Sequence, residues 1–346
     1  MENKVHTFNL KIDWGLINLV SQIDRFDASW TTIEKKEGQS LKQLKSFATI
    51  RSVGASTRIE GSKLSDEEVE VLLNNLDISK IKDRDSQEVI GYFETLDLIT
   101  ESYFDITVTE NNIKSLHNLL LKYSEKDAWH KGDYKQHSNA VEAALPDGSK
   151  QIIFQTTEPG FPTQDAMRKL IAWYDDDNKI HPLVKCALFT YEFLSIHPFQ
   201  DGNGRLSRLL STLLLLKNGY KWIQYVSFEH EIESRKIEYY RVLRNCQSQR
   251  PNEDVSSWIN FFFDALSNIQ EQLMMKLATK GVETKLAPKE KSVLVFIENN
   301  PGCKSGEIAN KLGIPVPTVK KILPGLLAKD LIEKHGVGPG TNYSIK

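Results

Sequence analysis

The sequence predicts a mainly α-helical protein with one small β-hairpin and a separate, small C-terminal unit. Apolar residues recur at helical spacing over most of the 346 residues. One stretch, 139–155, instead places two short extended runs around a cluster of turn-forming residues. Near the C-terminus, a stretch rich in Lys, Gly and Thr separates residues 288–346 from the rest. These three observations define the expected organisation.

The N-terminal part, residues 1–108, is expected to be helical. Ser65 and Glu68 form a capping box in "LSDEEVEVLLNNL", which marks the start of a helix. Helical spacing continues at 85–103 and 109–123.

The predicted core, residues 109–277, contains the hairpin. "NAVEAAL" and "KQIIFQT" flank the turn-type cluster 146–149. Of the helices that follow, the second is apolar on nearly all faces, which predicts a buried central helix. The five helices expected after the hairpin are 164–176, 183–196, 205–218, 229–247 and 253–277.

The C-terminal unit follows a predicted linker, 278–287. Three helices and an extended pair closed by "GVGPG" give 288–346 the order of a winged helix-turn-helix domain. Residues 285–346 carry ten lysines and five acids, so their local charge is near +5, which permits phosphate contacts. Base readout usually relies on Arg, Asn or Gln, however, and Pro324 interrupts the third helix. DNA binding, dimerisation and target docking all stay open.

The overall composition indicates an ordinary globular chain. It is 40% hydrophobic and 26% charged, and the formal net charge of −2 gives no global sign of nucleic-acid binding. No segment approaches the ~18 continuous apolar residues of a membrane span, and the first residues lack a signal peptide's apolar core. The three cysteines form no CxxC pair, so no zinc site or disulfide framework is expected. A cytoplasmic protein without membrane contact is predicted.

Polar chemistry concentrates in "HPFQDGNGRLSR", residues 197–208, between two apolar helices. The Gly-Asn-Gly turn at 202–204 permits unusual backbone angles and exposes N–H groups at the positive start of a helix, a natural anion site. Arg205 and Arg208 lie three residues apart, on one face of that helix. Two guanidiniums beside such a turn suit a polyphosphate.

The same stretch supplies a base and a metal ligand. Asp201 offers hard oxygen atoms that can hold Mg²⁺ against phosphate. His197, at the end of the buried helix, can take a proton from an incoming hydroxyl. Each feature alone has an ordinary structural explanation, such as a core histidine, surface arginines or a plain interhelical turn. Their joint occurrence in twelve residues favours a nucleotide-dependent transferase.

This stretch matches, position by position, the HxFx(D/E)GNGRxxR signature of the Fic-domain family, so the chain resembles the Fic adenylyltransferases (AMPylators). Their reaction transfers AMP from ATP to a Ser, Thr or Tyr hydroxyl of a protein and releases pyrophosphate. The resemblance implies a Fic-type helical core with a hairpin flap, His197 as base and Asp201 as Mg²⁺ ligand. Arg205 and Arg208 would hold the β- and γ-phosphates. The implied nucleotide-binding set from the motif is Asp201, Gly202, Asn203, Gly204, Arg205, Leu206, Ser207 and Arg208.

A second motif, "STRIEG" at 56–61, matches the family's (S/T)xxxE(G/N) inhibitory pattern. By this resemblance, Glu60 pairs with Arg208. A carboxylate bidentate to a guanidinium would occupy the donors that a γ-phosphate needs. The alternative is that Glu60 is an ordinary solvated acid. In some relatives the same glutamate supports removal of AMP, so net de-AMPylation stays open.

Two further regions are expected near the nucleotide. The hairpin, 139–155, falls where the family has its flap, which binds target segments by strand addition. Ile152, Ile153, Phe154 and Gln155 would touch the nucleotide from there. Tyr239 and Tyr240 would stack on adenine. A purely structural hairpin and tyrosines packed in the core are the open alternatives.

Two functions of different class follow. The first is an ATP- and Mg²⁺-dependent adenylyltransferase, restrained by Glu60, whose partner is a protein with a hydroxyl side chain or the protein itself; a homodimer is compatible with it. The second is a DNA-binding transcriptional regulator whose Fic-type region senses a ligand. Intact His197, Asp201 and Arg208 favour the enzyme, because a relic need not keep the catalytic base.

Overall fold

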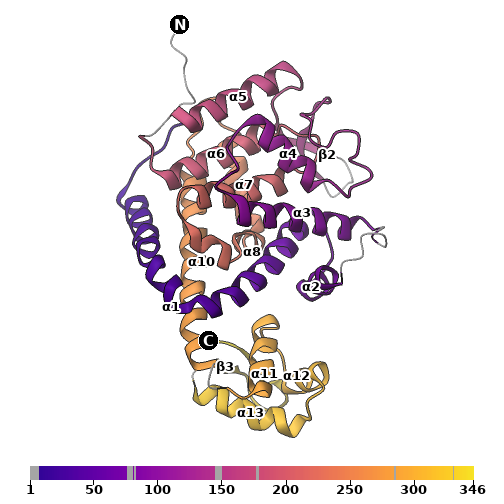
Figure 1. Ribbon diagram of the computed structural model, residues 1–346, viewed down its shortest axis with the longest axis vertical. Helices are drawn as coiled ribbons and strands as arrows, with labels where there is room; N and C mark the ends of the chain where they lie inside the picture. Colours follow the sequence, from indigo (N-terminus) through magenta and orange to yellow (C-terminus); the bar gives the residue numbers. More distant parts are fainter. Residues whose placement is uncertain are drawn as a thin grey trace. The chain divides into compact units, whose positions relative to one another are not determined.

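The computed structural model describes residues 8–75, 81, 83–144, 150–176, 179–283, 286–329 and 331–346. The chain forms two compact units, Met1–Gln272 and Leu273–Lys346. Both are mainly helical, as the sequence predicts (Figure 1). In the described part of the chain, no helix combines the length and the apolar character needed to cross a membrane.

The first unit consists of helices and one hairpin. Its capping box at Ser65 is confirmed: the Ser65 hydroxyl accepts from the Glu68 amide, and the Glu68 carboxylate accepts from the Ser65 amide. The elements, in chain order, are α1 (Trp14–Ile59), α2 (Asp66–Asn74), α3 (Arg84–Ser102), α4 (Glu110–Leu120), β1 (Ala140–Ala144), β2 (Lys150–Gln155), α5 (Phe161–Asp176), α6 (Pro182–Ile196), α7 (Asn203–Lys217), the 3₁₀ helix η2 (Lys221–Tyr225), α8 (Phe228–Ser234), α9 (Lys236–Gln247) and α10 (Ser256–Glu283), whose residues after Gln272 belong to the second unit.

The helix boundaries differ from the sequence prediction in three places. The N-terminal region begins with one helix of 46 residues, α1, which ends where Gly61 takes a φ of 106°. The helix predicted at 229–247 is divided into α8 and α9 at Arg235, whose φ of −112° and ψ of 27° leave the helical region. Helix α10 continues to Glu283, through the first residues of the predicted linker.

The hairpin is present, with β1 antiparallel to β2 and a register shift between Val141 and Glu142. The turn predicted at 146–149 lies outside the described residues. Hydrogen bonds between the strands fix the register from Ala140 opposite Gln155 to Ala144 opposite Lys150.

Helices α6 and α7 form the interior of the first unit (Figure 1). Nearly every residue of α6 from Leu183 onward is buried, which confirms the central helix predicted from its apolar faces. All residues of α7 from Arg205 to Leu216 are buried as well. The short turn between these two helices therefore lies against the core, where its polar groups need defined partners.

The second unit contains three helices and a two-stranded antiparallel sheet, in the predicted order. These are α11 (Pro288–Asn299), α12 (Ser305–Leu312), α13 (Val316–Ala328), β3 (Ile332–His335) and β4 (Asn342–Ile345). The apolar stripe of α13 is buried at Val319, Ile322, Leu323 and Leu326, and Leu327 packs against this core. Pro324 lies inside α13. DNA binding by this unit stays a prediction.

Candidate active site

His197 lies where α6 ends. Pro198 follows it, and a residue before proline avoids helical backbone angles. His197 adopts left-handed angles, with a φ of 52° and a ψ of 60°. Such angles cost a non-glycine residue about 1–3 kcal/mol. Tertiary contacts therefore hold His197 in a conformation that an isolated helix end would not choose.

The His197 ring is oriented and neutral. Its Nδ1 lies 3.4 Å from the carbonyl oxygen of Leu194. Because a carbonyl only accepts, Nδ1 carries the hydrogen and Nε2 carries the lone pair. Burial, helped by the charge of Lys135, lowers the pKa of His197 to about 4. At neutral pH the ring is in the form that a general base requires.

The turn before α7 is closed by Asn203. The side-chain oxygen of Asn203 accepts from the Phe199 amide at 2.9 Å, and its side-chain nitrogen donates to the Phe199 carbonyl at 2.7 Å. Gly202 takes a φ of 81°, a conformation that suits glycine, and provides no side-chain cap for α7. The first amides of a helix have no acceptor within it, so they form an anion-binding end. The anion site predicted at this turn would thus be built from backbone groups.

His117, on α4, braces this turn. Its ring stacks on Phe199, with centroids 3.8 Å apart and planes 12° apart. Its Nδ1 accepts from the Gly132 amide at 2.9 Å, so its Nε2 donates to the Asp201 carbonyl oxygen, also at 2.9 Å. Burial lowers the pKa of His117 to about 4. The neutral ring therefore acts as a fixed bridge between α4 and the turn.

The Asp201 carboxylate is surrounded by donors. Its Oδ2 accepts from Lys126 at 3.0 Å, and its Oδ1 accepts from Arg205 at 3.1 Å and from the Gly202 amide. Burial alone would raise the pKa of Asp201, but these neighbours hold it well below its usual range. The carboxylate is therefore ionised, and it is 35% exposed.

These properties fit a magnesium ion. Mg²⁺ is usually held by one or two carboxylates together with phosphate and water oxygens. Among the described residues, no group of three His, Cys, Asp or Glu side chains could hold a metal ion. The single ionised and partly exposed carboxylate of Asp201 is the group that would hold such an ion.

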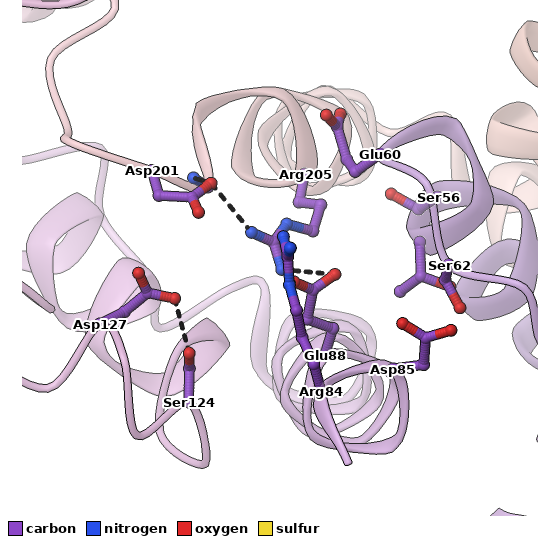
Figure 2. Close-up of polar contacts among 12 residues, drawn as sticks. Ser56, Glu60, Ser62, Arg84, Asp85, Glu88, Ser124, Asp127, Asp201 and Arg205 are labelled. Atoms are coloured by element: carbon purple, nitrogen blue, oxygen red, sulfur yellow. Dashed lines mark hydrogen bonds and ion pairs between the residues drawn. The ribbon is translucent and has the colours of Figure 1, made fainter.

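Arg205 is buried between carboxylates. Its guanidinium is 1% exposed and lies between two carboxylates, 3.1 Å from Asp201 and 3.2 Å from Glu88 (Figure 2). Glu88, on α3, also accepts from Arg84 at 2.7 Å. These carboxylates compensate the buried charge of the guanidinium. Arg205 also lines the cavity described below, so its predicted contact with the β- and γ-phosphates stays a prediction.

Arg208 is the arginine that reaches α1. Its Nε donates to the Ser56 hydroxyl at 2.8 Å, and its Nη2 donates to the Ser56 carbonyl at 3.0 Å and to Glu60 Oε1 at 2.8 Å. Burial would raise the pKa of Glu60, but Arg208 outweighs this effect and lowers it. The predicted Glu60–Arg208 pair is present. It differs from the expected bidentate pair: Glu60 accepts from Nη2 through one oxygen, while Nε and the second Nη2 hydrogen are directed to Ser56.

Glu60 approaches α7 very closely. A Cβ atom placed on Gly204 would collide with Glu60 Oε1, so a side chain at 204 would require the carboxylate to move. The end of α1 that carries Glu60 is anchored. Arg58 donates to both oxygens of Glu233, at 2.7 and 3.0 Å, and Lys236 donates to the Ile59 carbonyl at 2.7 Å. Glu60 is therefore held at the start of α7 by a fixed helix end.

A cavity of about 260 Å³ lies at this place. Glu60 and the Tyr239–Tyr240 pair contribute to its wall, and Tyr239 also packs against Trp258, which fits the core alternative. Leu206 and Ser207 are buried, and the Ser207 hydroxyl donates to the Gly204 carbonyl at 2.7 Å, so their side chains do not line the cavity. The motif residues that line it are His197, Gln200, Asp201, Gly202, Asn203, Gly204, Arg205 and Arg208.

Two of the four predicted hairpin side chains, Phe154 and Gln155, are described by the structure. Phe154 is half-buried, and Gln155 donates to the Ser138 hydroxyl at 3.0 Å. Neither is among the described residues that line the cavity. The side chains of Ile152 and Ile153 lie outside the described part of the structure.

Sequence reasoning missed four residues of this site: Glu88, His117, Lys126 and Lys135. Each lies outside the 197–208 motif, on a helix or loop that only folding brings to the turn. The sequence contains only a weak indication that these residues belong to the site. Glu88 and His117 are polar residues that occupy buried positions of α3 and α4. A polar residue on the apolar face of a predicted helix was the one sign of a special role.

Fold and site together define a mainly helical protein with a glycine-containing turn at a helix start, a neutral histidine and an ionised aspartate around one cavity. Residues 107–215 match the Fic/DOC family. The protein adenylyltransferase Fic of Drosophila melanogaster is 22% identical over 286 residues, which cover 76% of this chain and 54% of that protein. Its Drosophila virilis counterpart is 22% identical over 293 residues, covering 80% and 56%. The chain thus spans about half the length of these relatives.

Solved structures show the same fold. A Fic family protein from Desulfovibrio desulfuricans G20 aligns with a TM-score of 0.65 and 24% identity, covering 98% of both chains. A Fic domain containing signaling protein from Bacteroides thetaiotaomicron VPI-5482 aligns with a TM-score of 0.61 and 22% identity, covering 75% of this chain and 97% of that one. The likeness to the first extends over both units of the chain.

Proposed function

We propose that this protein is an adenylyltransferase that transfers AMP from ATP to a Ser, Thr or Tyr hydroxyl of a target protein or of itself. The observation that carries the proposal is one cavity lined by His197, Asp201, the start of α7 and Arg208. The residues on different sides of the cavity suit different parts of the reaction. The helix start and Arg208 suit phosphate oxygens, while His197 suits the incoming hydroxyl.

The chain's own residues supply base and orientation. Nε2 of His197 accepts the hydroxyl proton as the oxygen forms a bond to the α-phosphorus. The bond from that phosphorus to the bridging oxygen of the β-phosphate breaks, and pyrophosphate leaves with the electron pair. A bound Mg²⁺ would neutralise phosphate charge, and Asp201 would hold it.

Glu60 restrains this activity in the proposal. Its carboxylate takes an Arg208 donor and sits against Gly204, where phosphate oxygens would lie. The cavity of about 260 Å³ is smaller than the ~300–1,000 Å³ typical of ligand sites. A triphosphate would have to displace the carboxylate or bind with its α-phosphate misplaced.

The test compares two positions of the label in ATP. Purified Glu60→Gly protein with Mg²⁺ should incorporate label from the α-phosphate and none from the γ-phosphate, and intact mass should rise by one AMP residue. Glu60→Gly combined with His197→Ala is the control and should incorporate neither. Incorporation of γ-label would indicate a kinase-like reaction, and absence of both labels with added protein targets would contradict the proposal.

A further inference from the structure

Three side chains join the β1–β2 hairpin to the turn that carries His197. Lys135 and Asn139 precede β1, and Thr156 follows β2. We call Lys135, Asn139 and Thr156 the hairpin clasp. Its members lie at both open ends of the hairpin, so they fix where the two strands leave the core.

The Lys135 amine has an acceptor for each of its hydrogens. Nζ donates to Thr156 Oγ1 at 2.8 Å, to Asn139 Oδ1 at 2.9 Å and to the Ile196 carbonyl at 3.2 Å. The Thr156 hydroxyl directs its own hydrogen to Asn139, 2.5 Å from the carbonyl and 2.6 Å from Oδ1. Three acceptors match the three N–H bonds of an ammonium group, whereas a neutral amine has only two.

The clasp also holds the backbone on both sides of His197. The Ile196 carbonyl just before His197 accepts from the Lys135 side chain, and the Pro198 carbonyl just after it accepts from the Lys135 amide at 2.8 Å. Asn139 Nδ2 donates to the Phe199 carbonyl at 2.8 Å. These bonds lie where the backbone of His197 is left-handed, so they help to maintain that conformation.

The charge of Lys135 is buried, with 2% of the residue exposed. Burial lowers the pKa of Lys135 to about 8, and Glu158 opposes this effect. The amine is therefore still mainly protonated at neutral pH. None of its three acceptors is a carboxylate. The charged groups that act on His197 are Lys135, which disfavours the imidazolium, and Glu60 and Asp201, which favour it.

We propose that Lys135 is a positioning residue for the reaction: it fastens the hairpin to the turn and places a buried positive charge beside the backbone that carries His197. This inference rests on the proposed role of His197 as base. It couples the hairpin, where a target strand would bind, to the base. A shift of the hairpin would alter both the backbone and the electrostatic surroundings of His197.

The test measures the titration of the His197 ring by NMR in the full chain without nucleotide or target. Lys135→Met keeps the length of the side chain and removes its charge, whereas Lys135→Arg keeps the charge. Lys169→Met, on the surface of α5, is the control for loss of a lysine. The ring signal is assigned by its absence in His197→Gln.

Lys135→Met should raise the pKa of His197 by about one unit, since one nearby like charge is removed. Lys135→Arg and Lys169→Met should leave it near the parent value. An unchanged pKa in Lys135→Met, or equal shifts in the Met and Arg variants, would overturn the proposal. If Lys135→Met fails to fold, Thr156→Val is used, which removes one acceptor of the Lys135 amine. An unaltered His197 titration in Thr156→Val, together with a rise of one unit or more in the pKa of His197 in Lys135→Arg, would equally overturn the proposal. Because the readout needs no turnover, failure of AMP transfer would contradict only the proposed function.

Discussion

The carboxylate of Glu60 lies 2.8 Å from the guanidinium of Arg208, although 148 residues separate them in the chain. The contact joins the C-terminal end of α1 to the first turns of α7, at the edge of the cavity that we assign to the nucleotide. Both helices are fixed at this point, α7 by its burial and α1 by the Arg58–Glu233 pair. The fold therefore holds Glu60 and Arg208 in contact.

Replacement of Glu60 by glycine should increase AMP transfer about 10²-fold, because a misplaced reacting group costs on that order in rate. The measurement is the initial rate of incorporation from ATP labelled at the α-phosphate. Glu67→Gly, at an exposed position of α2, is the matched control and should behave like the parent. Equal rates for Glu60→Gly and the parent would remove the inhibitory assignment.

Replacement of Ser56 by alanine should increase AMP transfer by a smaller factor, up to about 5-fold, since one hydrogen bond contributes ~1 kcal/mol. Ser56 holds the Nε side of Arg208 toward α1. Without its hydroxyl, a phosphate competes more easily for the guanidinium. Ser52→Ala, one turn earlier on α1 and also buried, controls for loss of a serine. The idea fails if the two variants have the same rate.

Replacement of Asp201 by asparagine in the Glu60→Gly background should raise the Mg²⁺ concentration for half-maximal transfer at least ~10-fold, as a neutral amide is a poorer ligand for this hard cation. The assay is a Mg²⁺ titration at saturating ATP. Asp133→Asn, at an exposed position, should leave the titration unchanged. A Mg²⁺ dependence that Asp201→Asn does not alter would exclude this carboxylate as the ligand.

His117 should make the fold sensitive to acid. Its folded pKa of about 4 lies below the ordinary value of 6.5, so the unfolded chain binds the proton first as the pH falls. Stability is therefore present above the ordinary value and is lost as the pH drops toward about 4. Each such histidine contributes up to about 1.4 kcal/mol per pH unit within that window.

Urea unfolding at two pH values tests this dependence. Between pH of about 6.5 and about 5, His117→Gln should lose about 2 kcal/mol less free energy of unfolding than the parent. His137→Gln, at an exposed position, should lose as much as the parent. The same loss in His117→Gln and the parent would show that burial of this ring does not cause the sensitivity.

The sequence determined features that depend on neighbouring residues. The capping box at Ser65, the order of helices around the hairpin and the left-handed Gly202 follow from local backbone preferences, which act within a few residues. The chemical role of the 197–208 motif could be predicted for the same reason, because its polar residues are neighbours in sequence and lie on one turn. Local preference did not reveal the break at Arg235, where neither glycine nor proline marks the end of α8.

Tertiary structure decided the partners of those groups. Arg205 and Arg208 are three residues apart and look alike in sequence, yet one faces Glu88 and Asp201 while the other faces Ser56 and Glu60. Packing of α1 and α3 against α7 makes that distinction, and it brings carboxylates that no local pattern places near the turn. A charge buried within the fold needs an opposite charge or hydrogen-bond partners wherever the chain supplies them, so its partners depend on topology and not on sequence separation.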